Sequence, residues 1–176
     1  SNAMQAVYLT GPTVYLRAMV EDDKHHAAAW FDSRFPVNAA RAEAFLKEKL
    51  QGDPWDARWH LLAIVRRSDE AVVGSCRIEF GKQTASLRFH MAPWLDDADV
   101  LRAEALELVV PWLRDEHELL VITVEIAADE QRTLAAAEAA GLKAAVRMRE
   151  AIARAGHRVD LLIYQAVDPK VEADHA

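Results

Sequence analysis

Residues 84–127 read TASLRFHMAPWLDDADVLRAEALELVVPWLRDEHELLVITVEIA, and this stretch decides the fold. Thr84–Met91 has the pattern of a β-strand. Leu119–Ala127 is predominantly apolar, which is typical of a strand buried on both faces. Between the two strands, apolar residues recur at helical spacing along Leu101–Leu113. A strand, a helix and a second strand in this order predict a right-handed parallel crossover.

Strand and helix patterns also occur on both sides of this stretch. The additional strands expected are Thr13–Met19, Trp59–Arg67, Ala71–Phe80, Lys143–Ile152 and Arg158–Val167. The additional helices expected run from residues 21–23 to about Phe31, from an N-cap at Asn38 to a stop at residues 52–54, and from about Glu130 to Ala140, closed by Gly141. The sequence therefore predicts an α/β domain with about four helices. Its mixed, mostly antiparallel sheet has seven strands and one central parallel pair.

The chain has 176 residues, which fits one domain, expected over residues 8–168. We interpret Ser1–Ala3 as the remainder of a cleaved expression tag and residues 169–176 as an acidic tail outside the packed core. No apolar run is long enough to span a membrane, and no basic region is followed by an apolar one at the N-terminus, so we expect a cytoplasmic protein. The single cysteine, Cys76, excludes an internal disulfide and a cysteine-based metal site, and we expect no metal.

The charge balance bears on the partners. The 28 acidic residues outnumber the 21 basic ones, giving a formal net charge of −7. This balance argues against nucleic acid and against an anionic membrane as partners, because both are polyanions. A cationic substrate such as an amine suits the chain better.

Several local phrases, in this order and spacing, resemble the GNAT superfamily of acyl-CoA N-acyltransferases, and in particular its ribosomal-protein N-terminal acetyltransferases. The likeness extends over about Tyr8–Val167. The phrases are LTGPTVYLR at 9–17, VVG at 72–74, AEAAGL at 137–142, MRE at 148–150 and GHRVDLLIY at 156–164.

The resemblance implies the GNAT fold, acetyl-CoA as co-substrate and an acceptor that is a primary amine, on a small molecule or at a protein N-terminus. It also implies a homodimer as one assembly state. The amide arm of the cofactor is expected along the strand edge at Phe89, His90 and Met91. Its pyrophosphate is expected at the loop and first helical turn that follow, at residues that include Val100, Leu101 and Arg102.

That loop departs from the family pattern, which places glycines where the phosphates approach. Here the loop carries aspartates, and Val100 and Arg102 stand at the two small-residue positions. An aspartate about 6 Å from a phosphate charge costs roughly 3 kcal/mol at an effective dielectric constant of about 20. Arg102 offers a compensating guanidinium. In the alternative interpretation, Arg102 is a solvated helix residue and the aspartates cap the helix.

The candidate catalytic residues come from three elements. Ala137 stands where many family members have a tyrosine acid, so the resemblance assigns the contact with the cofactor sulfur to Thr133, which otherwise caps the helix start. Glu79 and Glu150 are candidate general bases if they face the cleft, and ordinary outward-facing strand residues if they do not. His90 is a candidate proton relay.

Aromatic residues are expected at the acceptor end of the cleft, although core packing explains them equally well. They are Trp30, Phe31, Phe35, Trp55 and Trp59. Two other functions stay open at this point. One is a GNAT-fold protein that has lost coenzyme A binding and serves as a ligand-binding or protein-interaction module. The other is a scaffold that dimerises through an exposed edge of the last strand.

Overall fold

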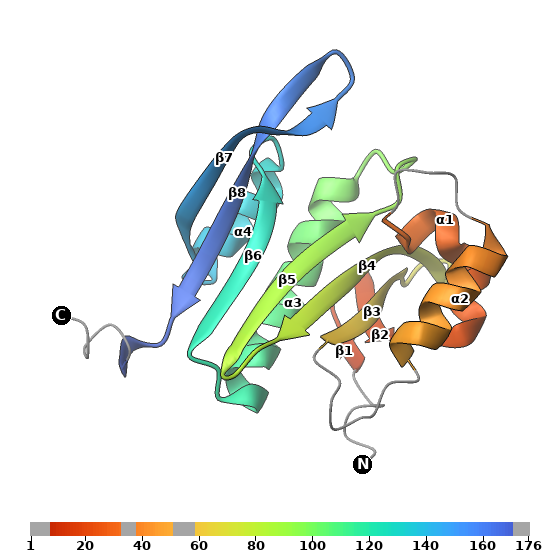
Figure 1. Ribbon diagram of the computed structural model, residues 1–176, viewed down its shortest axis with the longest axis horizontal. Helices are drawn as coiled ribbons and strands as arrows, with labels where there is room; N and C mark the ends of the chain where they lie inside the picture. The colour runs from red at the N-terminus through yellow and green to blue at the C-terminus, as the bar shows by residue number, and fades with distance from the viewer. Residues whose placement is uncertain (1–7, 33–37, 51–58, 171–176) are drawn as a thin grey trace.

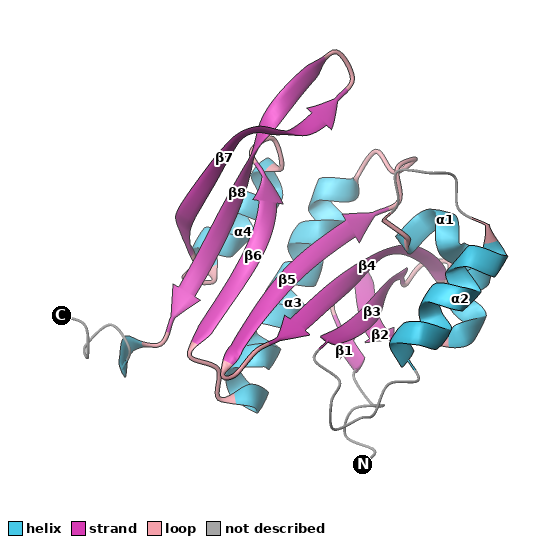
Figure 2. Cartoon of the chain, viewed as in Figure 1, coloured by secondary structure: helices cyan, strands magenta, loops and turns pink. Residues whose placement is uncertain are grey.

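The computed structural model describes residues 8–32, 38–50 and 59–170. Ser1–Ala3, most of the acidic tail, and residues 52–54 lie outside this part of the chain. Within it, eight strands form one sheet in the order β1-β2-β3-β4-β5-β6-β8-β7 (Figures 1 and 2). The strands are β1 (Tyr8–Thr10), β2 (Val14–Ala18), β3 (Trp59–Arg66), β4 (Ala71–Phe80), β5 (Thr84–Met91), β6 (Val121–Ala127), β7 (Lys143–Arg154) and β8 (His157–Val167).

The seven strands expected from the sequence are all present, each within two residues of its expected ends. The eighth strand, β1, corrects the strand count. It has three residues, none of them fully buried, so it leaves no readable alternation in the sequence. A second correction concerns the sheet edge. The last strand, β8, pairs with β6 and β7 and is not an edge, whereas β7 is the edge and is exposed along almost its whole length.

Helices cover both faces of the sheet, and each face has its own apolar core. The helical elements are a 3₁₀ helix η2 (Glu21–His26), α1 (Ala27–Trp30), α2 (Ala39–Leu50), α3 (Ala98–His117) and α4 (Gln131–Ala139). Helices α3 and α4 pack on one face, while η2, α1 and α2 lie against the other (Figure 2). The helix expected from residue 21 is therefore 3₁₀ in its first half. The expected N-cap of α2 is confirmed, because Asn38 Oδ1 accepts the Arg41 N–H at 2.9 Å. No helix in the described ranges is long and apolar enough to cross a membrane.

The parallel pair is short, and this fixes the position of the site. β5 and β6 pair only from Thr84–Leu87 to Val121–Val124. Beyond this point, β5 stays paired with β4 as far as Met91, and β6 stays paired with β8 as far as Ala127. The two strands therefore separate towards their carboxyl ends, as Figure 1 shows.

A buried ion pair holds the short helix α1 against the sheet. Nη1 and Nη2 of Arg17 each donate to the Asp23 carboxylate at 2.8 Å, and this hydrogen bonding raises the pKa of Arg17. The Asp23 side chain is only 3% exposed, and its backbone oxygen accepts the Trp30 indole N–H at 2.8 Å. Ser75 of β4 donates its hydroxyl to the Trp30 carbonyl at 2.9 Å. These contacts place the end of α1 beside β4.

Replacing Asp23 with asparagine tests this anchor. Asp23→Asn leaves the Arg17 charge without its carboxylate, and because Arg17 keeps some solvent contact we expect the free energy of unfolding to fall by about 2–3 kcal/mol. Urea denaturation measures the loss. Asp22→Asn is the matched control, because the Asp22 side chain is 88% exposed and should change stability by less than about 0.5 kcal/mol. Equal losses in the two variants would show that Asp23 is not an anchor.

Candidate active site

The separation of β5 and β6 opens into a cleft with a volume of about 630 Å³. Its walls come from Arg88–Met91 of β5, from Glu125 and Ala127 of β6, and from Arg102 in the first turns of α3. The β7–β8 hairpin closes the far side. The cleft therefore lies at the carboxyl ends of the parallel pair, where open α/β sheets hold their ligands.

The β5 edge offers backbone hydrogen-bonding groups to this cleft. The Ala92 N–H donates to the Val73 carbonyl at 2.8 Å, on the β4 side. Because hydrogen-bonded residues alternate in an antiparallel pair, Phe89 and Met91 direct their N–H and C=O groups away from β4 and into the cleft. An extended ligand with amide groups can pair with this edge as an added strand. Phe89, His90 and Met91 all line the cleft, and their contact with a cofactor stays a prediction.

Arg102 also lines the cleft, but an internal carboxylate neutralises it. Its Nη1 lies 2.5 Å from Glu130 Oε2 and 3.5 Å from Asp99 Oδ1. The Arg102 and Glu130 side chains are 14% and 15% exposed, so Arg102 is not a solvated helix residue. Glu130 Oε1 also accepts the Ala127 N–H at 2.6 Å. Burial raises the pKa of Glu130, and the charge of Arg102 opposes that shift.

Asp99 caps a helix, although not the helix to which it belongs. Its carboxylate accepts the backbone N–H of Arg132 at 2.7 Å and that of Thr133 at 3.1 Å, both in the first turn of α4. It also accepts the Thr133 hydroxyl at 2.7 Å. Thr133 is fully buried and lies outside the lining of the cleft, so its hydroxyl is held by Asp99. Asp97, the N-cap residue of α3, makes no side-chain capping bond.

The remaining sequence candidates lie away from the cleft. Val100 is half exposed on the outer surface, and Leu101 is buried in the core, so neither side chain lines the cleft. Glu79 is exposed on β4 and borders neither cavity described here. Glu150 is exposed in an irregular part of β7, with a left-handed φ of 51°, and its N–H donates to Asp160. The structure therefore does not bring the two expected bases into the cleft.

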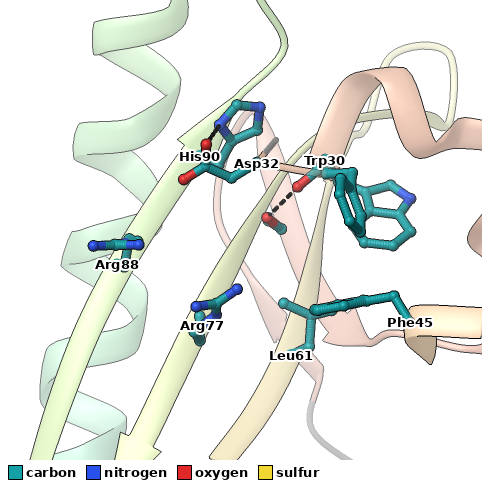
Figure 3. A pocket seen from close by; sticks show the side chains of 9 residues that line it. Trp30, Asp32, Phe45, Leu61, Arg77, Arg88 and His90 are labelled. Carbon is teal, nitrogen blue, oxygen red and sulfur yellow. Dashed lines mark hydrogen bonds and ion pairs between the residues drawn. The ribbon is translucent and has the colours of Figure 1, made fainter. Parts of the chain in front are cut away.

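A second, small cavity of about 30 Å³ lies on the α1–α2 side of the sheet. Its apolar wall consists of Trp30, Phe31, Phe45 and Leu61 (Figure 3). Trp30 and Phe31 line this small cavity, and their place at the acceptor end of the cleft stays a prediction. Phe35, Trp55 and the Trp59 side chain lie outside the part of the chain that the structure describes.

Asp32, Arg88 and His90 border both cavities and form the partition between them. His90 Nδ1 faces the Asp32 carboxylate at 4.0 Å (Figure 3). Its Nε2 is buried and has no hydrogen-bond partner among the described residues. Burial lowers the pKa of His90, although Asp32 opposes the shift, so the imidazole is neutral near pH 7. A buried nitrogen without a partner is a binding or proton-accepting position.

Sequence reasoning missed four polar residues of the cleft, which are Asp32, Arg88, Glu125 and Arg154. Asp32 lies just after α1, and Arg88 and Glu125 lie on neighbouring strands. Arg88 Nε contacts Glu125 Oε2 at 2.6 Å across the gap between β5 and β6. For Arg88 and Glu125, the alternation along each strand predicts that the side chain points away from the core that lies on the α3–α4 face. Their pairing depends on the register of the parallel pair, which the sequence does not give.

This fold and cleft define an α/β protein with a cleft between two separating parallel strands, beside the start of a helix. No protein-family model matches the chain, and neither does any protein of curated function. Among solved structures, it is similar to a protein from Sphaerobacter thermophilus DSM 20745 assigned to the acetyltransferases, with 95% identity and a TM-score of 0.79 over 94% of this chain and 100% of that one. The chain belongs to the GNAT family of acetyltransferases.

Two more distant structures share the fold. The ribosomal-protein-S5-alanine acetyltransferase from Vibrio fischeri has 12% identity and a TM-score of 0.70, over 93% of this chain and 98% of that one. A ribosomal L7/L12 alpha-N-protein acetyltransferase, solved with coenzyme A, has 11% identity and a TM-score of 0.69, over 92% of this chain and 98% of that one. At such identities, the likeness is one of fold.

The capping role of Asp99 predicts a stability effect. Asp99→Ala removes the acceptor for two backbone N–H groups and leaves the buried Thr133 hydroxyl only its longer hydrogen bond, at 3.4 Å to the backbone carbonyl of residue 99, so we expect the free energy of unfolding to fall by about 2 kcal/mol. Asp97→Ala is the matched control and should change stability by less than about 0.5 kcal/mol. Thermal and urea denaturation compare the two variants. If Asp97→Ala cost as much as Asp99→Ala, the capping assignment would be wrong.

Proposed function

We propose that this protein transfers an acetyl group from acetyl-CoA to a primary amine by direct attack. The observation that carries the proposal is the open β5 edge, where Phe89 and Met91 direct backbone groups into the cleft. Acetyl-CoA supplies the thioester whose carbonyl carbon the amine attacks. Its amide arm suits an edge that lacks a neighbouring strand, and the edge runs towards the start of α3.

The phosphates are proposed to lie at the start of α3, with Arg102 as their cation. Free N–H groups and the helix dipole favour an anion there. Arg102 Nη1 is already paired with Glu130 at 2.5 Å, so a phosphate has to compete with that carboxylate for the guanidinium. This arrangement supports a rebuilt phosphate site in place of the glycine loop of the family. Its electrostatic strength depends on how readily Glu130 gives up Arg102.

His90 is proposed as the general base. Its Nε2 is unpartnered within the described structure and lies in the partition between the cleft and the small cavity. As the amine nitrogen bonds to the carbonyl carbon, Nε2 takes the proton that the amine loses. The carbon–sulfur bond then breaks, and its electron pair leaves with sulfur as the coenzyme A thiolate, which takes up a proton from the imidazolium or from solvent. A backbone N–H of the β5 edge is proposed to stabilise the oxyanion. The acceptor amine is proposed to enter from the small cavity, which shares Asp32, Arg88 and His90 with the cleft.

Calorimetric titration with acetyl-CoA tests the donor site. We expect micromolar affinity, about −8 kcal/mol, that weakens as salt is added. Glu130→Gln should tighten binding about tenfold, because it frees Arg102 and removes a nearby negative charge whose cost is about 3 kcal/mol before screening. Arg102→Ala should weaken binding at least about tenfold. Glu116→Gln, at the opposite end of α3, is the control and should leave the affinity unchanged.

The titration also separates the proposal from its alternative. Absence of binding at millimolar acetyl-CoA would mean that the chain has lost coenzyme A binding and acts as a ligand-binding or protein-interaction module. If the wild type binds and Glu130→Gln binds no better, Arg102 is not the phosphate ligand.

The pH dependence of turnover tests His90. Because burial lowers its pKa below the ordinary value of 6.5, the neutral base is present at neutral pH and is lost as the pH falls through that lowered pKa. We expect kcat to decline on this acid side in the wild type. His90→Gln should lower kcat by about 10²-fold and remove the decline. His26→Gln, on an exposed residue, should change neither. An unchanged acid limb in His90→Gln would exclude His90 as the base.

A further inference from the structure

The closed end of the cleft is bridged by side chains on the face that carries α1 and α2. The last backbone pair between β5 and β6 is Leu87 with Val124. One residue further along each strand, Arg88 Nε contacts Glu125 Oε2 at 2.6 Å. One residue before that backbone pair, on the same face as the ion pair, the Thr123 hydroxyl donates to the Ser86 hydroxyl at 3.1 Å. The strands are thus joined by backbone bonds up to Leu87 and by an ion pair immediately beyond.

This ion pair stands where an extended ligand on the β5 edge must end. Such a ligand runs from the start of α3 past Met91 and Phe89, and the paired segment that begins at Leu87 leaves it no further edge. Its last atoms therefore meet Arg88 and Glu125. Arg88 also borders the small cavity and lies beside it in Figure 3, so the ion pair is at the junction of the two cavities.

We propose that the Arg88–Glu125 ion pair determines the acyl specificity of the enzyme, admitting an acetyl group and excluding longer acyl groups. The inference rests on the proposed acetyl transfer and identifies which residues select the donor. A longer acyl chain would place methylene groups against two charged side chains, which they cannot hydrogen-bond, or would have to separate the pair. The hydrogen bond to Glu125 also raises the pKa of Arg88, so the guanidinium keeps its charge.

The double variant Arg88→Ala, Glu125→Ala tests the specificity. It removes both charges together and so leaves neither one unpaired. The measurement is kcat/KM with acetyl-CoA, propionyl-CoA and butyryl-CoA and one fixed amine. We expect the butyryl-to-acetyl ratio to rise at least about tenfold, in the range that one or two methylene groups are worth in a shaped site. The charge-swapped variant Arg88→Glu, Glu125→Arg rebuilds the pair and should restore the acetyl preference.

A distant ion pair of the same kind provides the control. Arg147 Nε contacts Asp160 Oδ2 at 2.6 Å between β7 and β8, and neither residue lines the cleft. Removing this pair with Arg147→Ala, Asp160→Ala should leave the acyl ratio unchanged. If thermal denaturation shows that the cleft double variant is unfolded, Glu125→Ala alone carries the same test, with a smaller rise in the ratio.

The possible results separate the proposed acyl specificity from the proposed acetyl transfer on which it rests. A folded double variant that uses acetyl-CoA and keeps the wild-type ratio overturns the inference and leaves acetyl transfer intact. If the charge-swapped variant has the same butyryl-to-acetyl ratio as the double alanine variant, the inference is also overturned. The ion pair would then be present without excluding the longer acyl group. Failure of the wild type to use acetyl-CoA overturns the proposed function itself.

Discussion

The site depends on one backbone constraint, which is that β5 and β6 pair for only four residues. β5 is held by β4 up to Met91 and β6 by β8 up to Ala127, so neither strand can follow the other. The β5 edge beyond Leu87 then carries backbone donors and acceptors without a strand beside them. Such groups are costly unless water or a ligand satisfies them. An amide-bearing ligand does so while it is held extended, and the strand separation therefore provides both the space and the hydrogen-bonding groups.

The acidic loop repels an anion less than its sequence indicates, because Asp99, one of its three aspartates, is hydrogen-bonded inside the protein. Asp99 accepts three hydrogen bonds from the start of α4, and Glu130 is paired with Arg102. These contacts link the first turns of α3 and α4 and give the loop a defined shape without glycine. One cost for a phosphate is the exchange of one buried partner of Arg102 for another. Asp96 and Asp97 stay exposed, so the total cost is this exchange together with their repulsion, without that of Asp99.

The sequence predicts the fold well because the information lies in local patterns. The pattern of apolar residues and the turn residues predict every strand except β1. The strand–helix–strand order of residues 84–127 predicts the parallel pair. The site is predicted less well because it depends on pairing. From the sequence, Thr133 is a candidate cofactor contact, but in the structure its hydroxyl donates to Asp99. Glu79 and Glu150 are candidate bases in the sequence, but the strand register places neither of them in the cleft. Arg88 and Glu125 become recognisable only when the strands lie side by side.

The partition between the cavities also has to balance two electrostatic demands. Burial lowers the pKa of His90 and so keeps the imidazole in its neutral, proton-accepting form near pH 7. A carboxylate close to the imidazole works against this by favouring the protonated form. Asp32 stands 4.0 Å away, beyond hydrogen-bonding distance, where it orients the ring and attracts a cationic acceptor without raising the pKa as far as a direct bond would.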